Sequence, residues 1–265
     1  VSCNQTVKFR DLLATARDLG ADALDTGPYI RREMGPDGPE LHRAVDPRRD
    51  QSYFLFATTR AQIAFLRFPL GGMGKDAVRT AAERFDLVVA DKPDSQDICF
   101  VPQGSYAQVV QKLRPGAADP GDIVHVDGRV MGRHQGIIHY TIGQRRGLGL
   151  GGESEPLFVV HLEPESRRVI VGPKAALARD RVILRDLNWL ASLPLDPGGR
   201  RVEVKLRSVS EPAAATLYPR DSGGAEIVLD EPQFGVSPGQ AAVCYEGSRV
   251  LGGGWIATAE NRLAA

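Results

Sequence analysis

Two cysteines in polar segments are the residues of this sequence best suited to covalent chemistry. Cys3 stands just before an expected helix, whose N-terminal partial positive charge would favour the thiolate. Cys99 lies in the polar segment 94–100. Two loop thiols that meet can relay sulfur: one carries an activated sulfur, the other attacks it, and a disulfide remains. Inert or partly buried thiols are the alternative that these residues alone leave open.

The other groups with reactive or ligating side chains have structural explanations. Cys244 lies in an apolar run and is expected in the core. The glycine-rich segment 147–152 lacks the following helix and the Lys-Ser/Thr ending of a phosphate loop, so a turn or loop is expected. No histidine pairs with another His or Cys at ligand spacing, so no permanently bound metal is predicted. The histidines are His42, His125, His134, His139 and His161.

Basic residues with an interleaved aromatic side chain form a second candidate site. The run contains Arg129, Arg133, His134, Arg145 and Arg146, with Tyr140 between them. This composition contacts phosphates and stacks on unpaired bases, although a solvated face of a small domain is the alternative. A further polar cluster, 48–51, opens an expected helix, where Asp50 could cap the helix or contact a ligand.

Helix and strand patterns alternate over the first hundred residues. Helices are predicted at 7–19, with Gly20 as C-cap, at 52–64 and at 75–85, and buried strands at 21–26 and 87–90. This alternation predicts an α/β layer with a parallel sheet.

Short β-type runs replace the helical pattern from about residue 117. The first group is 122–126, 136–142, 157–162 and 168–171, and the second is 182–184, 202–208, 214–218, 225–229, 240–245 and 250–256. Evenly spaced short strands with turn signals predict a small β-rich middle followed by a β-barrel.

Composition narrows the class of protein. The 265 residues include 33 Lys+Arg and 33 Asp+Glu, 42% are hydrophobic, and three are cysteine. These values are typical of a soluble globular protein in a reducing cytoplasm, and no apolar run approaches the ~18 residues that span a bilayer. Because the chain begins at Val1 and not at Met, we expect that a preceding segment is missing.

Several long motifs resemble bacterial tRNA-specific 2-thiouridylases, and they occur in the order found in that family. They are Cys3-Asn4 with Val7-Lys8-Phe9, Asp50-Gln51-Ser52-Tyr53-Phe54-Leu55, Phe68-Pro69-Leu70-Gly71-Gly72, Asp94-Ser95-Gln96-Asp97-Ile98-Cys99-Phe100, Tyr140-Thr141-Ile142-Gly143-Gln144-Arg145-Arg146-Gly147-Leu148-Gly149, Pro238-Gly239-Gln240 with Tyr245, and Gly252-Gly253-Gly254 before Ile256. The resemblance implies part of a Rossmann-like PP-loop ATP pyrophosphatase domain at 1–108, a central β-rich tRNA-binding domain at 109–174, and a C-terminal β-barrel at 175–265.

The resemblance also implies a reaction. Enzymes of that family replace the 2-oxygen of the wobble uridine, position 34, in certain tRNAs with sulfur. ATP, with Mg²⁺, activates the oxygen, and a cysteine persulfide delivers the sulfur. The expected partners are tRNAs of the Lys, Glu and Gln type and a sulfur-donor protein of a persulfide relay, without a membrane.

Residue by residue, the family's roles fall on matching positions of this sequence. Cys99 matches the persulfide carrier, and Cys3 matches the nucleophile that ends in a disulfide with it. Gly27 matches a glycine that contacts ATP. The positions that match tRNA contacts, or that lie in the basic run, are Arg49, Asp50, Gln51, Arg145, Arg146, Arg207, Ser208 and Gln240.

Four departures from the family pattern bear on activity. The ATP loop Ser-Gly-Gly-x-Asp-Ser-Ser occurs nowhere in the sequence, so this chain is not expected to thiolate tRNA unaided. Asp25 and Pro28 stand where the family has Ala and His, and Ser208 replaces a Tyr. Asp25 and Pro28 favour, as an alternative, a tRNA-binding module whose front domain is degenerate. The equal numbers of basic and acidic residues motivate a further alternative, a redox-regulated dithiol protein without RNA.

Overall fold

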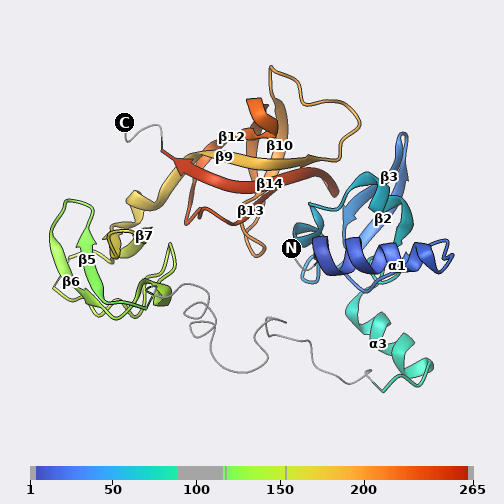
Figure 1. Cartoon of the computed structure of the whole chain (residues 1–265), viewed down its shortest axis with the longest axis horizontal. Helices are drawn as coiled ribbons and strands as arrows, with labels where there is room; N and C mark the ends of the chain where they lie inside the picture. The colour runs from blue at the N-terminus through green and yellow to red at the C-terminus, as the bar shows by residue number, and fades with distance from the viewer. Residues whose placement is uncertain (1–3, 89–115, 117, 153, 262–265) are drawn as a thin grey trace. The chain divides into compact units, whose positions relative to one another are not determined.

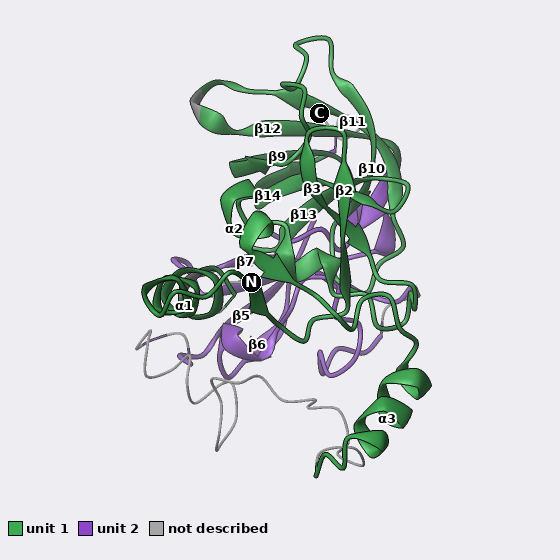
Figure 2. Ribbon diagram, turned by 90° about the vertical axis from the view of Figure 1, so that its right-hand side faces the viewer, with its two compact units in different colours: residues 1–92, 180–231, 238–260 green, residues 93–179, 232–237, 261–265 purple. Residues whose placement is uncertain are grey.

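A computed structural model describes residues 4–88, 116, 118–152 and 154–261. The chain divides into two compact units, drawn in separate colours in Figure 2. Unit 1 comprises residues 1–92, 180–231 and 238–260, and unit 2 comprises 93–179, 232–237 and 261–265.

The first predicted helix is present and has two parts. A π-helix, η1 (Asn4–Leu12), continues as α1 (Leu13–Asp18) (Figure 1). Gly20 follows with φ of 76°, its N–H bonds the carbonyl of Arg17, and the next N–H bonds that of Ala16. These two bonds satisfy carbonyls of the last turn while a left-handed glycine reverses the chain, which confirms the predicted C-cap.

The second predicted helix is interrupted. A 3₁₀ turn, η2 (Ser52–Leu55), is followed by α2 (Arg60–Phe65). Thr59 starts α2 with a capping box: its hydroxyl accepts from the Gln62 N–H at 3.3 Å, and the Gln62 side chain accepts from the Thr59 N–H at 2.8 Å. This reciprocal cap fixes a new helix start where the periodicity alone suggested continuity.

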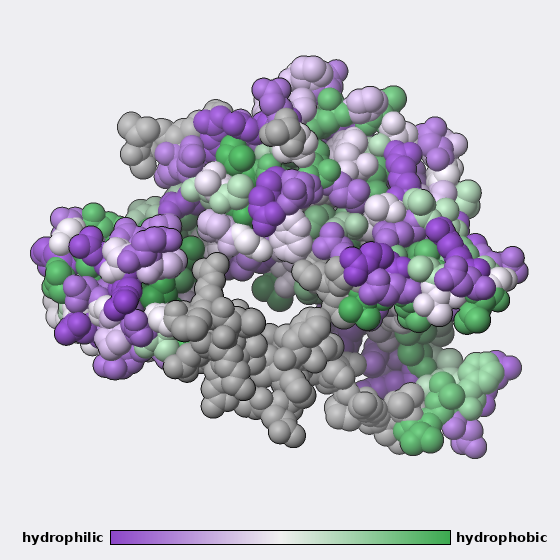
Figure 3. Space-filling model, in the orientation of Figure 1, coloured by the Kyte–Doolittle hydropathy of each residue, from purple (hydrophilic) through white to green (hydrophobic). Residues whose placement is uncertain are grey.

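The third predicted helix, α3 (Lys75–Arg84), forms as expected. None of its described side chains is buried. Figure 3 accordingly shows apolar and polar side chains together on the surface of this helix.

One of the two predicted front strands is present. β1 (Leu24–Asp25) pairs in parallel with β4 (Leu66–Arg67), so the predicted parallel layer exists as a short two-stranded sheet. The strand predicted at 87–90 is wrong in its described part, since Leu87 and Val88 belong to no strand and Val88 is fully exposed. Residues 89 and 90 lie outside the described residues.

A hairpin that the sequence analysis did not predict follows β1. β2 (Ile30–Gly35) and β3 (Gly38–Arg43) are antiparallel, and Gly38 has φ of 112° beside the tight turn. β3 then pairs with the last barrel strand through His42 and Arg249, which attaches the hairpin to the barrel sheet (Figure 2).

Six strands form the predicted C-terminal barrel. They are β9 (Ala178–Trp189), β10 (Arg200–Lys205), β11 (Ala213–Pro219), β12 (Ala225–Phe234), β13 (Ala241–Glu246) and β14 (Arg249–Glu260), with a 3₁₀ turn, η5 (Asp221–Gly223), between β11 and β12. The sheet runs β13-β10-β11-β12-β9-β14, and pairing of β13 with β14 closes it. Closure leaves no free edge within these six strands.

The front segment and the barrel share one hydrophobic core. The Tyr53 hydroxyl donates to the Ala241 carbonyl at 2.8 Å, and the rings of Phe56 and Trp255 pack edge to face at 5.6 Å. The buried members of this core include Phe9, Leu13, Ile30, Leu41, Tyr53, Phe56, Val243, Tyr245 and Val250. The α/β front is therefore not packed around a core of its own.

Unit 2 is built on a four-stranded sheet. Its strands β5 (Gly121–His125), β6 (Val130–His134), β7 (Phe158–Glu163) and β8 (Arg168–Gly172) run in the order β6-β5-β8-β7, with β5 and β8 parallel. A 3₁₀ turn, η4 (Lys174–Leu177), follows β8.

One strand predicted in unit 2 is wrong. The segment 136–142 contains a 3₁₀ turn, η3 (Ile137–His139), and no strand. Gly136, with φ of 150°, lies so close to Ala118 that a Cβ would come within 2.8 Å of its Cα. The chain bends there instead of continuing in extended form, although Ile137 still packs on the core of the sheet.

Candidate functional site

The candidate site begins at the carboxyl end of β1. The Thr26 N–H bonds the Arg67 carbonyl at 3.0 Å, and the next residue, Gly27, is exposed. A Cβ on Gly27 would have only Leu70 Cδ1 nearby, at 3.9 Å, so the backbone here is open to a ligand. Ligands of α/β proteins bind beyond the carboxyl ends of parallel strands, which is where this glycine lies.

Gln51 joins two stretches that the sequence analysis had singled out separately. Its side-chain oxygen accepts from the Tyr29 N–H at 2.9 Å, and its own N–H bonds the Tyr29 carbonyl at 2.9 Å. The structure thereby brings the loop of Gly27 beside the stretch that contains Arg49, Asp50 and Gln51.

Asp50 is held by the protein's own donors. One carboxylate oxygen accepts from the N–H groups of Ala44 and Ser52, at 3.1 and 3.2 Å, and the other from the Ser52 hydroxyl at 2.8 Å. Of the two roles considered for Asp50, these bonds favour the structural one: it fixes the turn that presents Arg49 and Gln51.

Tyr245 connects this turn to the barrel. Its hydroxyl lies 3.1 Å from the Ser52 hydroxyl, and the Arg43 guanidinium stacks 4.1 Å from the centre of its ring. Burial raises the pKa of Tyr245, so the phenol stays neutral. In the sequence Tyr245 is only a motif residue, because no local pattern links it to Ser52, 193 positions away.

The barrel contributes the other predicted contacts of unit 1. Arg207 is exposed in a turn that Ser210 closes, with the Ser210 hydroxyl donating to the Arg207 carbonyl at 3.0 Å. Ser208 lies half-buried in the same turn. Among the described residues, the buried side-chain oxygen of Gln240 has no hydrogen-bond partner, while its backbone carbonyl accepts from the Ile256 N–H at 2.8 Å.

The basic run of unit 2 is partly neutralised. Arg129 donates to Asp127 at 2.9 Å, and Arg133 lies 3.6 Å from Asp122. His134 is 2% exposed and bonded to backbone groups, so it is a core residue and not a surface cation. Arg145 and Arg146 are exposed in a loop, and the side chains of Arg129 and Arg133 are also exposed despite their acidic neighbours.

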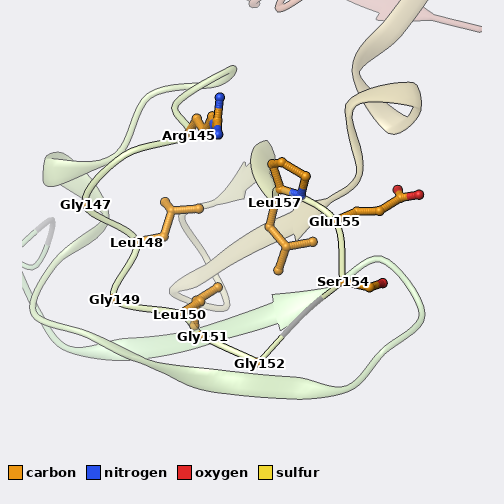
Figure 4. A pocket seen from close by; sticks show the side chains of 11 residues that line it. Arg145, Gly147, Leu148, Gly149, Leu150, Gly151, Gly152, Ser154, Glu155 and Leu157 are labelled. Carbon is orange, nitrogen blue, oxygen red and sulfur yellow. The ribbon is translucent and has the colours of Figure 1, made fainter.

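The glycine-rich loop after these arginines surrounds a pocket of about 420 Å³. Figure 4 shows Leu148, Leu150 and Leu157 projecting into the space that the loop encloses, with Arg145 at its edge. Residues 147–152 belong to no helix or strand, as predicted.

The two cysteines predicted to react, Cys3 and Cys99, lie outside the described residues, and their roles stay predictions. The third, Cys244, is fully buried in β13, and burial raises its pKa to about 12. This confirms that Cys244 is a core residue, and its thiol stays protonated and unreactive at neutral pH.

Neither a metal cluster nor a membrane span is found in the part of the chain that the structure describes. No three His, Cys, Asp or Glu side chains there lie close enough to hold a metal ion. No helix within the same residues combines the length and apolar character needed to cross a bilayer.

Comparisons with known proteins agree with this architecture. Family models match three consecutive segments: a tRNA methyl transferase HUP domain over residues 1–103, a tRNA methyl transferase PRC-barrel domain over 108–173, and an aminomethyltransferase beta-barrel domain over 179–256. The α/β front, the β-rich middle and the C-terminal barrel expected from the sequence are thereby confirmed.

Curated relatives are similar to almost the whole chain. A protein of Rhodospirillum centenum named tRNA-specific 2-thiouridylase MnmA is 63% identical over 98% of this chain and 68% of its own length. Proteins of the same name from Cereibacter sphaeroides and Hyphomonas neptunium are 60% and 59% identical, over 97% and 100% of this chain and 69% of their own lengths. The chain belongs to the tRNA-specific 2-thiouridylase family.

Proposed function

We propose that this protein takes part in 2-thiolation of the wobble uridine, position 34, of tRNAs of the Lys, Glu and Gln type. The observation that carries the proposal is 58–63% identity to relatives named tRNA-specific 2-thiouridylase over nearly the full chain. The tRNA and a sulfur-donor protein are its macromolecular partners, and the cytoplasm is its compartment.

The three modules divide the work. Residues 1–108 hold the reacting groups, 109–174 contact tRNA through Arg145 and Arg146, and 175–265 contact it through Arg207, Ser208 and Gln240. The exposure of Arg145, Arg146 and Arg207 supports this assignment, because phosphate contacts need accessible cations. The buried oxygen of Gln240 that lacks a partner among the described residues would gain one from a ligand donor.

The open backbone at the end of β1 supports an ATP contact at Gly27. The backbone of Gly27 is exposed with no side chain closer than Leu70, and Gln51 holds the loop through Tyr29. When bound with Mg²⁺, ATP supplies the group that makes the C2 oxygen of uridine able to leave. The protein's own part is to present this backbone and to accept the uridine after it has left its base stack.

Sulfur transfer is assigned to the two cysteines. The terminal sulfur of a Cys99 persulfide attacks C2, the activated oxygen leaves, and the sulfur then bridges C2 and Cys99. The Cys3 thiolate attacks the Cys99 sulfur, which breaks the S–S bond, leaves the transferred sulfur on C2 and forms a Cys3–Cys99 disulfide. A two-electron thiol reductant restores both thiols.

Persulfide loading tests this assignment separately from tRNA binding. Cys99→Ser is expected to abolish transfer of ³⁵S from a cysteine desulfurase relay to the protein, because no other thiol carries the sulfur. Loading is measured by autoradiography after non-reducing electrophoresis. Cys244→Ala is the matched control and is expected to load like the parent, since its thiol is buried. Undiminished loading of Cys99→Ser would remove Cys99 from the mechanism.

A second candidate, a tRNA-binding module without catalysis, is favoured by the sequence departures at Asp25 and Pro28. Asp25 is exposed in β1, immediately before the Gly27 loop. If the parent protein binds tRNA but does not load sulfur, the result supports this second function over sulfur transfer.

A further inference from the structure

Unit 1 has a cavity of about 700 Å³, which is lined by the segments 45–49 and 74–79. Four cationic side chains line it against two carboxylates. The cations are Arg48, Arg49, Lys75 and Arg79, and the carboxylates are Asp46 and Asp76. Of these six residues, only Arg49 belongs to a stretch that the family resemblance assigns to tRNA.

The cations of the lining outnumber its carboxylates by four to two. Asp46 is engaged in its own turn, where it accepts from the Arg48 N–H at 3.0 Å and lies 3.7 Å from Arg48 Nε. The Arg48 side chain is nevertheless 90% exposed, and Arg79 is also exposed. Because Arg48 and Arg79 are exposed and the lining carries a net positive charge, an anion is favoured there.

The backbone at this cavity reinforces the positive charge. α3 begins there, its N-cap Gly74 makes no side-chain cap bond, and Asp76 is the acidic residue of the first turn. The first N–H groups of a helix have no acceptor within the helix, and they carry partial positive charge that stabilises anions. The Lys75 ammonium also lies 6.0 Å from the centre of the Tyr29 ring, so the cavity adjoins the loop that Gln51 holds.

We propose that this cavity binds a phosphate group, with Arg48, Lys75 and Arg79 as recognition residues beside Arg49. The inference rests on the proposed function, which supplies two sources of that chemistry: the tRNA backbone and the pyrophosphate part of the nucleotide. Arginine at the wall and backbone N–H groups at a helix start are the donors that phosphate oxygens accept from.

Charge removal in the whole chain tests the cavity. The variants are Arg79→Gln and Arg48→Gln, which alter opposite walls, and Arg84→Gln is the control because Arg84 lies on α3 but does not line the cavity. Affinity for a tRNA transcript is measured by fluorescence anisotropy between 50 and 200 mM salt. Inorganic pyrophosphate binding is measured by isothermal titration calorimetry.

If the tRNA backbone is the source, each cavity variant lowers the slope of log K against log salt by about 1, which is roughly a fourfold change over this salt range, and Arg84→Gln matches the parent. If the nucleotide is the source, the variants weaken pyrophosphate binding and leave the tRNA slope unchanged. Parental values in both assays for both variants overturn the proposal.

The same assays distinguish failure of the proposed function from failure of the cavity proposal. A parent protein that does not bind tRNA contradicts the proposed function, and the pyrophosphate titration then decides the cavity alone. Because the two substitutions lie in separate segments and both side chains are exposed, misfolding of one variant leaves the other to give the answer.

Discussion

Two carboxylates of unit 1, Glu226 and Asp50, have different kinds of hydrogen-bond donors. The side chain of Glu226 accepts from Arg181 Nη2 at 2.9 Å and lies 3.2 Å from Arg220 Nη1, and these arginines hold its pKa below the ordinary value. Asp50 instead accepts from backbone and hydroxyl donors. Glu226 therefore links barrel stability to pH through ion pairs, whereas Asp50 shapes a turn.

Acid is expected to remove the contribution of Glu226. Because its folded pKa lies below the unfolded value of about 4.3, the stabilisation is present above that value and is lost as pH falls through the folded pKa. Glu226→Gln should unfold at lower urea concentration than the parent at pH 7, and the difference should shrink towards pH 3. Urea midpoints at pH 7, 5 and 3 measure this.

The exposed Glu211 provides the control for that series. Glu211→Gln should follow the parent at every pH. A constant difference between Glu226→Gln and the parent from pH 7 to pH 3 would show that the Glu226 charge is not what stabilises the barrel.

At the scale of elements, two adjacent glycines differ in the space around them. Replacing each with alanine distinguishes the effect of a steric clash from the effect of reduced chain flexibility. A Cβ on Gly71 would stand 1.8 Å from the Ile30 carbonyl oxygen, whereas a Cβ on Gly72 would meet nothing within 4 Å. Gly71→Ala must push the start of β2 away, and we expect it to lower the free energy of unfolding by roughly 2 kcal/mol or more. Gly72→Ala should change it by less than about 1 kcal/mol.

Chemical denaturation of the two alanine variants and the parent measures these changes in the free energy of unfolding. The neighbouring position serves as a matched control, since both substitutions add the same methyl group to the same turn. Equal midpoints for the two variants would contradict the close approach of Gly71 to β2.

The elements that sequence could predict are those with a regular local pattern. The barrel strands alternate apolar and polar residues or are continuously apolar, and each predicted barrel run overlaps an observed strand. The β2–β3 hairpin was missed because Arg31, Arg32 and Glu33 give it the composition of a loop, although it gains β14 as a tertiary neighbour. Segment 136–142 has the pattern of a short β-type run, but Gly136 bends the chain there.

The same limit applies to the candidate site. Gly27 and Gln51 were both found from motifs, yet only the fold shows that Gln51 holds the Gly27 loop through Tyr29. Only one wall of the cavity around Arg48 and Arg79 gave a sequence signal, the polar cluster 48–51. The other wall lies about 25 positions away, and neither wall is a phosphate-loop motif. The sequence indicates which residues could bind a ligand, but only the structure shows which of them lie side by side.

At the scale of the molecule, the shared core of unit 1 predicts coupled stability of the front and the barrel. Tyr245→Phe removes the hydroxyl that meets Ser52, which should cost about 1 kcal/mol. Native-state hydrogen exchange should show this loss both at 52–56 in the front and at 241–246 in the barrel, because both segments open together. Loss confined to the front would contradict a common core.

Tyr218→Phe is the control: it tests whether removing any tyrosine hydroxyl lowers hydrogen-exchange protection in the front segment. Tyr218 is half-buried in β11 and lies outside the shared core. Exchange at 52–56 is expected to match the parent in this variant.

The pairing of Tyr53 with Ala241 also has a consequence for synthesis on the ribosome. These residues are 188 positions apart, so at ~5–20 residues per second the front segment emerges roughly 10–40 s before its barrel partners exist. During that interval the apolar side chains of Phe9, Tyr53 and Phe56 have no β13 to pack against. We therefore expect the front segment to complete its packing only after the last barrel strands have been translated, and to expose apolar side chains until then.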